Sequence, residues 1–205
     1  MNPVVRKAAR SIGATAVLLV AIGVAAPVAA AADEPNVEIA SAVYEGSGCP
    51  KRGDARASLD GDRIKVNYER LSVRAGGSGE PSSERHNCVT NLKLRVDEGW
   101  QYAIGRLSMS GYATLKRGAT GTAIATHWHA GLPSTGEARN DLSGPYDDEF
   151  DSYDRQHGNW SECDANRALN INAQVFVEAK GTGGSSELQL NERRGLTAEL
   201  KFRRC

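Results

Sequence analysis

Apolar and polar residues alternate with a period of two in several segments beyond residue 60. In 63–68 (RIKVNY), 91–96 (NLKLRV) and 196–202 (LTAELKF) every second residue is apolar, and 168–177 (ALNINAQVFV) holds the longest such run. This alternation is typical of antiparallel strands that bury one face and expose the other. No segment beyond residue 33 shows the period of an amphipathic helix. We therefore predict an all-β fold, an antiparallel β-sandwich with a jelly roll as one candidate topology.

Two local signals refine this prediction. The sequence LDGD at 59–62 predicts a hairpin turn, because Gly61 can adopt a positive φ without steric cost. In 100–115 the apolar residues fall on even positions at the start and on odd positions later. A β-bulge near Gly105–Arg106, which inserts one residue, would bring both halves of this strand onto the same face.

The first 32 residues predict an export signal rather than part of the fold. Basic residues precede a short apolar run at 11–26, and small residues follow it up to Ala32. A transmembrane helix is the alternative, but the run is diluted by Ala and Gly and is shorter than the roughly 20 residues that a bilayer requires. We expect cleavage after Ala32, which leaves a single secreted domain at 33–205 with no membrane contact after processing.

The charge balance narrows the range of partners. The whole chain has 25 basic and 25 acidic residues. Arg6, Lys7 and Arg10 lie in the expected signal, so the remaining chain has a net charge of −3. A chain this balanced does not suggest nucleic acid or an anionic membrane as its partner.

The four cysteines, Cys49, Cys88, Cys163 and Cys205, predict two disulfides, because their number is even and the chain is expected to be exported. The sequence has no CxxC or CxxH motif that would favour a metal site instead. Of the three connectivities we favour Cys49–Cys88 and Cys163–Cys205, each closing a loop of about 40 residues. A simple meander of the last three strands would separate Cys163 from Cys205, so the second pair requires a strand to change sheets or to bend.

The segment THWHAG at 126–131 contains the chain's clearest candidates for ligand or metal binding, His127 and His129. Ile124 and Trp128 share one face of the expected strand, which predicts that this face is the core. His127 and His129 would then point outward, two residues apart, as a candidate ligand or metal pair. Two imidazoles do not complete a zinc site, which has three or four protein ligands. We therefore expect no cofactor, and we expect alanine substitutions to be costly at Trp128 and nearly neutral at the histidines.

Other candidate chemistry is sparse. Asp147, Asp148 and Asp151 lie in PYDDEFDSYD at 145–154, where clustered carboxylates could bind calcium, but the EF-hand spacing is absent. A solvated acidic loop is the simpler interpretation. No GxSxG or HExxH motif is present. The sequence therefore favours a protein without enzymatic activity, although it does not decide the question.

An ordered set of short motifs spans nearly the whole chain beyond the expected signal. They are GSGCP at 46–50, NC at 87–88, GW.YAI at 99–104, GYA.L..G at 111–118, GPY at 144–146, W..C at 160–163, LNIN at 169–172 and Cys205. In this set the chain resembles domain-of-unknown-function family 4360, small secreted proteins of bacteria and fungi. The resemblance implies an exported, disulfide-bonded, all-β domain, and it implies no activity.

We predict a secreted β-sandwich that binds an extracellular partner, which could be a glycan, a cell-wall component or another protein. One alternative is an extracellular enzyme that acts on polysaccharide or peptide, with His127, His129 and an acidic residue in its site. Another is a protease inhibitor, for which the segment 74–86 offers a candidate loop. Fold analogy does not separate these classes, because sandwiches serve many functions.

Overall fold

The computed structural model describes residues 34–205 except 70, 133–135, 157, 164–166 and 191–194. The predicted export signal at 1–32 lies outside the described residues. The strands are β1 (Val37–Glu45), β2 (Ala55–Asp60), β3 (Arg63–Tyr68), β4 (Ser72–Ala75), β5 (Ser83–Val96), β6 (Trp100–Leu115), β7 (Thr120–His129), β8 (Gly136–Ser143), β9 (Tyr146–Arg155), β10 (Leu169–Glu178), β11 (Ser186–Leu190) and β12 (Leu196–Arg204). No described segment forms a helix long and apolar enough to cross a membrane.

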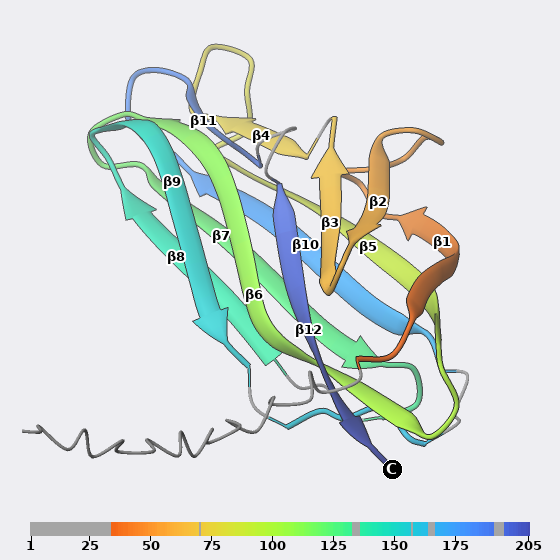
Figure 1. Cartoon of the computed structure of the whole chain (residues 1–205). Coiled ribbons are helices and arrows are strands. Elements are labelled where there is room, and N and C mark those ends of the chain that lie inside the picture. Colours follow the sequence, from red (N-terminus) through yellow and green to blue (C-terminus); the bar gives the residue numbers. More distant parts are fainter. Residues whose placement is uncertain (1–33, 70, 133–135, 157, 164–166, 191–194) are drawn as a thin grey trace, which may run out of the picture. The chain divides into compact units, whose positions relative to one another are not determined.

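The strands form two antiparallel sheets that pack as a sandwich (Figure 1). Sheet A has the order β1-β5-β10-β7-β8. In sheet B the long strand β6 lies at the centre, with β9 along one side and β12 and β11 along the other. Strands β3 and β2 continue beyond β12, and β4 continues beyond β11. The chain passes repeatedly from one sheet to the other, as it does in jelly-roll sandwiches, and the predicted fold class is confirmed.

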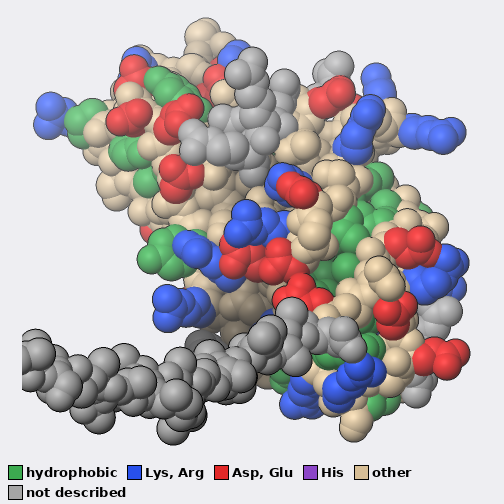
Figure 2. All heavy atoms as spheres, viewed as in Figure 1, with side chains coloured by type: hydrophobic (Ala, Val, Ile, Leu, Met, Phe, Trp, Pro, Cys, Tyr) green, Lys and Arg blue, Asp and Glu red, His purple; other side chains and the backbone are tan. Residues whose placement is uncertain are grey.

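The alternating segments form strands in the predicted phase. Every second residue of β10, from Leu169 to Val177, is buried, and so are Ile64, Val66 and Tyr68 of β3. These side chains fill the space between the sheets. Charged side chains are spread over the outer face of β6, β9 and β12 (Figure 2), as expected for strands with one solvated face.

Both local signals are also confirmed. Asp60 pairs with Arg63 across the turn between β2 and β3, and Gly61 has a φ of 61°. Between β6 and β12 the register shifts by one residue, which leaves Gly105 as the extra residue of a bulge. The bulge lets the even and the odd apolar residues of β6 face the same core.

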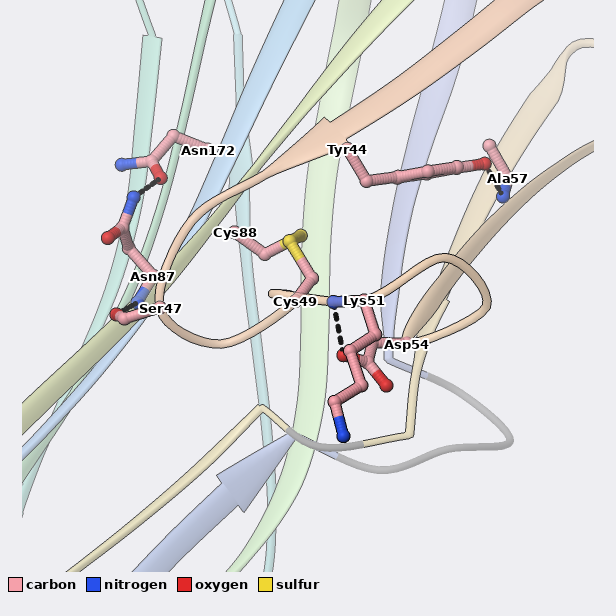
Figure 3. Close-up of a disulfide and its surroundings, with 9 residues drawn as sticks. All are labelled: Tyr44, Ser47, Cys49, Lys51, Asp54, Ala57, Asn87, Cys88 and Asn172. Carbon is pink, nitrogen blue, oxygen red and sulfur yellow. Dashed lines mark hydrogen bonds between the residues drawn. A yellow bond between two sulfur atoms is a disulfide. The ribbon is translucent and has the colours of Figure 1, made fainter.

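The Cys49–Cys88 disulfide fastens the loop after β1 to the middle of β5 (Figure 3). Both sulfur-bearing residues are buried, and their Cα atoms lie 5.5 Å apart. Beside them, the Gly48 amide donates to the Asn87 carbonyl at 2.9 Å. Gly46 has a φ of 141°, and a Cβ atom there would lie 2.2 Å from the Asn87 carbonyl oxygen. Only glycine allows the loop to approach β5 this closely.

The Cys163–Cys205 disulfide also forms, with Cα atoms 5.9 Å apart. The last strands are not a meander within one sheet. The chain crosses sheet A as β10 and then enters sheet B, where β11 and β12 pair with successive stretches of β6 in the same direction. This return path brings Cys205 back to the end of the sandwich where β10 begins. The change of sheet supplies the geometry that the second pairing requires.

Candidate functional site

The predicted orientation of His127 and His129 is wrong. On β7 the core face carries Gly121, Ala123 and Ala125 followed by both histidines, each of which is 1% exposed. The neighbouring side chains on the other face, including Ile124 and Trp128, are partly exposed. Close packing explains why the core face begins with small residues. A Cβ atom at Gly121 would lie 2.9 Å from the Leu188 side chain on the facing sheet.

The segment that follows β9 accepts the hydrogen bonds of the buried histidines. The Nε2 atom of His129 donates to the Asn159 carbonyl oxygen at 3.1 Å. The Nε2 atom of His127 lies 3.3 Å from Oε1 of Gln156, whose own amide nitrogen donates to the Glu137 carbonyl at 3.2 Å. This second bond fixes the orientation of the Gln156 amide, so Nε2 of His127 is the donor. The histidines are therefore integrated into the core rather than presented to solvent.

Burial also decides the charge of this pair. Loss of hydration lowers the pKa of His127 to about 4, although the bond to Gln156 partly opposes the shift. Burial likewise lowers the pKa of His129. Both rings are neutral near pH 7. A Cβ atom at Gly136 would lie 2.1 Å from Nε2 of His127, so the neighbouring strand leaves no space around the ring. Neither imidazole is open to solvent.

The acidic segment is a strand, not the predicted loop. Asp147 and Asp151 lie four residues apart on the same face of β9, and Asp148 lies on the other face. Oδ1 of Asp147 accepts from the Thr114 hydroxyl at 2.8 Å and from the Tyr112 hydroxyl at 2.9 Å, and these bonds lower the pKa of Asp147. Among the described residues, no three His, Cys, Asp or Glu side chains come together as a metal site. A calcium or zinc site thus gains no support from this geometry.

The segment 74–86 is not a single loop. Arg74 and Ala75 end β4, and residues 83–86 begin β5, so only 76–82 connect the two strands. A carboxylate oxygen of Glu80 accepts from the Gly77 amide at 2.9 Å, and the Gly76 amide donates to the Pro81 carbonyl at 2.9 Å. The connection is a short, internally bonded turn. Its role as an inhibitor loop stays a prediction.

The structure contains a cleft that the sequence did not predict. Its volume is about 1030 Å³, and it lies where β1, the end of β5 and the start of β6 meet the segment before Cys163. It is lined by Ala40, Ser41, Lys93, Leu94, Arg95, Val96, Asp97, Glu98, Gly99, Trp100, Tyr102, Ser161 and Glu162. Both sheets contribute to it, because the turn at 97–99 joins β5 of sheet A to β6 of sheet B. The β1–β5 pairing has a register shift between Ile39 and Ser41, and Ala40, which lies within this shift, is part of the lining.

Two aromatic side chains distinguish this cleft. Trp100 is part of the lining. The guanidinium carbon of Arg204 lies 4.2 Å from the centroid of the Trp100 indole, and Arg204 itself does not line the cleft. Tyr102 is 4% exposed, and its hydroxyl is buried without a hydrogen-bond partner among the described residues. A buried hydroxyl without a partner is costly to the folded protein. Burial raises the pKa of Tyr102, so the hydroxyl stays protonated.

Backbone hydrogen bonds place these side chains. The Ser161 amide donates to the Tyr102 carbonyl at 2.8 Å, and the Tyr102 amide donates to the Ser161 hydroxyl at 3.1 Å. The Tyr102 ring meets the His129 ring edge to face, with centroids 5.2 Å apart. His129 therefore packs against Tyr102, one of the residues that line the cleft. The motif GW.YAI at 99–104 was the sequence signal that could have identified Trp100 and Tyr102.

These features define a disulfide-bonded β-sandwich with a cleft to which both sheets contribute. The chain belongs to the family described as Domain of unknown function (DUF4360), whose model matches residues 35–205. An uncharacterized secreted protein of the fungus Arthroderma benhamiae is 30% identical over 154 residues, which are 73% of this chain and 62% of that protein. The chain thus spans less than two thirds of that relative. The secreted relative and the two disulfides place this chain outside the cell.

The chain is also similar to a solved structure, TmCBM61 in complex with beta-1,4-galactotriose. The TM-score is 0.31, the sequences are 10% identical, and the alignment covers 82% of this chain and 91% of that one. A similarity of this degree bears on neither the ligand nor the chemistry of this chain.

Proposed function

We propose that this protein is a secreted glycan-binding module and that the cleft beside Trp100 holds the sugar. The observation that carries the proposal is the cleft itself, whose lining places the Trp100 indole beside several polar side chains. Binding sites for small molecules are typically concave, with a few polar groups placed among apolar surface. The cleft is concave and combines Trp100, Leu94 and Val96 with a larger share of polar residues. The Cys163–Cys205 disulfide lies beside it, because Cys163 follows Glu162 and the Cys205 amide donates to the Gly99 carbonyl at 2.9 Å.

The chemistry of the lining favours a sugar over an apolar ligand. A sugar ring presents C–H groups on its faces and hydroxyl groups around its edge. An indole can cover the C–H face, because it combines a large apolar surface with low conformational freedom. Ser41, Lys93 and Glu98 supply hydrogen-bonding groups around the aromatic side chains. An apolar ligand would leave these polar groups without partners, which would oppose its binding.

The alternative that the protein is an enzyme relied on His127 and His129 as exposed site residues, and both are buried. His127 and His129 face the interior and have lowered pKa values because they are buried. A general base must reach the proton that it abstracts. A binding role for the cleft requires no such residue.

Replacing Trp100 with alanine should weaken glycan binding at least about tenfold, or about 1.4 kcal/mol, because aromatic anchors carry much of the energy of such sites. The wild-type protein would first be screened against a panel of neutral polysaccharides, and affinities for the best ligand would be measured by isothermal titration calorimetry. Trp128→Ala is the matched control, since Trp128 is partly exposed on the outer face of sheet A. The proposal fails if no glycan binds, or if both variants bind as the wild type does.

We further propose that residues 1–32 are an export signal and that the secreted chain begins after Ala32. The basic start, the short apolar run and the small residues near Ala32 support this proposal. Intact-mass measurement of the protein recovered from the medium should give a chain that starts between Ala31 and Asp33. A full-length chain retained in the membrane fraction would contradict the proposal.

A further inference from the structure

The outer face of sheet B carries a group of cations without carboxylate partners, which we call the basic surface. Its members are Arg106 on β6, Arg155 on β9, and Lys201 and Arg203 on β12. Within the described part of the chain, none of the four forms an ion pair. Glu199 has its backbone opposite Arg106, but its carboxylate lies 3.6 Å from Arg63 instead. The protein therefore leaves this positive charge unneutralised.

The strand register concentrates the charge. Arg106 and Arg155 are directly opposite each other in the β6–β9 ladder, so their side chains leave the sheet on the same face. Like charges in this position repel each other and destabilise the pair. Neither guanidinium donates a hydrogen bond to another described residue. An anion bound between them would relieve the repulsion and use the free donors.

Aromatic rings hold three of the four cations in place. The guanidinium carbon of Arg106 lies 4.1 Å from the centroid of the Tyr153 ring. Arg203 lies 4.2 Å and Lys201 5.3 Å from the centroid of the Trp160 ring. A cation over an aromatic face is stabilised by the ring, which orients it without neutralising it. Tyr153 is itself 63% exposed, so a flat apolar surface lies beside the charges.

We infer that the basic surface binds an anionic polysaccharide, a polymer that carries carboxylate groups on its sugar rings. Lys201 and Arg203 are two residues apart on β12, a spacing of roughly 7 Å. This spacing suits a polymer with separated charges, and the exposed ring of Tyr153 suits a sugar face. The site lies on the outer face of the sheet and shares no residue with the cleft lining. The inference therefore goes beyond the proposed function and does not rest on it.

A polysaccharide fits better than nucleic acid for an electrostatic reason. Asp147, Glu149 and Asp151 precede Tyr153 and Arg155 on the same face of β9, and acidic side chains gather at that end of the face (Figure 2). The chain beyond the proposed signal has a net charge of −3. DNA carries one charge per about 1.7 Å of helix axis, so it would bring many phosphates toward these carboxylates. A polymer with fewer charges can contact the basic surface alone.

The test measures binding to polygalacturonate by biolayer interferometry, with fully methyl-esterified polygalacturonate as the uncharged comparison. Arg155→Glu should weaken binding to polygalacturonate at least about tenfold, because it replaces an attraction by a repulsion. Arg52→Glu is the matched control. Arg52 is exposed outside the basic surface, and its substitution changes the net charge by the same amount. This control should bind within about twofold of the wild type, and salt at about 0.5 M should weaken wild-type binding.

Several results would overturn the inference. One is that the esterified polymer binds as tightly as polygalacturonate, and another is that Arg155→Glu and Arg52→Glu lose the same affinity for polygalacturonate. A third is that a DNA duplex or phosphatidylserine vesicles bind more tightly than polygalacturonate and with the same dependence on Arg155. The cleft proposal fails separately. Arg155→Glu should retain any affinity for a neutral glycan, and absence of neutral-glycan binding would leave the basic surface untouched.

Discussion

Replacing His127 with alanine should lower the free energy of unfolding by about 3 kcal/mol, in the range of large-to-small substitutions in a core. His127 is 1% exposed, so the substitution leaves a cavity between the sheets. It also leaves Oε1 of Gln156 without the donor that now lies 3.3 Å away. Urea unfolding at pH 7 would measure the loss.

Trp128→Ala is the control for this prediction, because Trp128 is the next residue of β7 and points to the other face. Its side chain is partly exposed, and we expect a loss of about 1 kcal/mol. A larger loss at Trp128 than at His127 would show that the strand has the opposite face buried. The two single substitutions therefore test the orientation of β7 directly.

Acid should lower the stability of the protein, because the His127 side chain is buried. The pKa of His127 is about 4 in the folded protein, below the ordinary value of 6.5. The unfolded chain therefore binds more protons than the folded one between these values, and stability falls as the pH drops through this window. Between pH ~7 and ~5 the contribution of His127 should shrink by about 2 kcal/mol. His127→Gln removes the titrating group, so its stability should fall less than that of the wild type over this range. Equal pH profiles would contradict this prediction.

The sequence misplaced β7 for an identifiable reason. A period of two shows that a strand has two faces, but the choice of core face depends on which face is more apolar. On β7 the large residues Ile124 and Trp128 suggested one face, while the true core face begins with Gly121 and two alanines. Leu115 and Leu188 occupy the space in front of Gly121. The small residues of β7 allow the facing side chains to pack closely against this strand. The sequence alone does not show this, because it does not say which strands face β7.

Other strands were predictable because their two faces differ in polarity. Asn170, Asn172 and Gln174 oppose an apolar face on β10, so only one orientation is compatible with burial. The bulge at Gly105 was predictable because the apolar phase of β6 changes there. The cleft could not be predicted, since Ala40, Trp100 and Ser161 are far apart in the sequence and come together only in the folded chain. The basic surface likewise depends on the register that sets Arg106 against Arg155.

Removing the Cys49–Cys88 disulfide by the double substitution Cys49→Ser/Cys88→Ser should lower the free energy of unfolding by about 4 kcal/mol or more. The bond closes a loop with a sequence separation of 39. In the chain-entropy model such a closure stabilises the fold by restricting the unfolded chain, by about 4 kcal/mol. Cys88 is fully buried and Cys49 is 3% exposed, so the serines would also place two hydroxyl groups in the core.

The second disulfide provides the matched comparison, because its sequence separation of 42 is nearly the same. Cys163 and Cys205 are exposed, so Cys163→Ser/Cys205→Ser removes a similar loop constraint without burying polar groups. Both double variants also avoid unpaired thiols. Denaturant unfolding of the two proteins should show the greater loss for the Cys49–Cys88 pair, and the difference would measure the effect of burial alone. Equal losses would mean that loop closure dominates at both sites, and an unchanged stability in either variant would show that the disulfide does not support the fold.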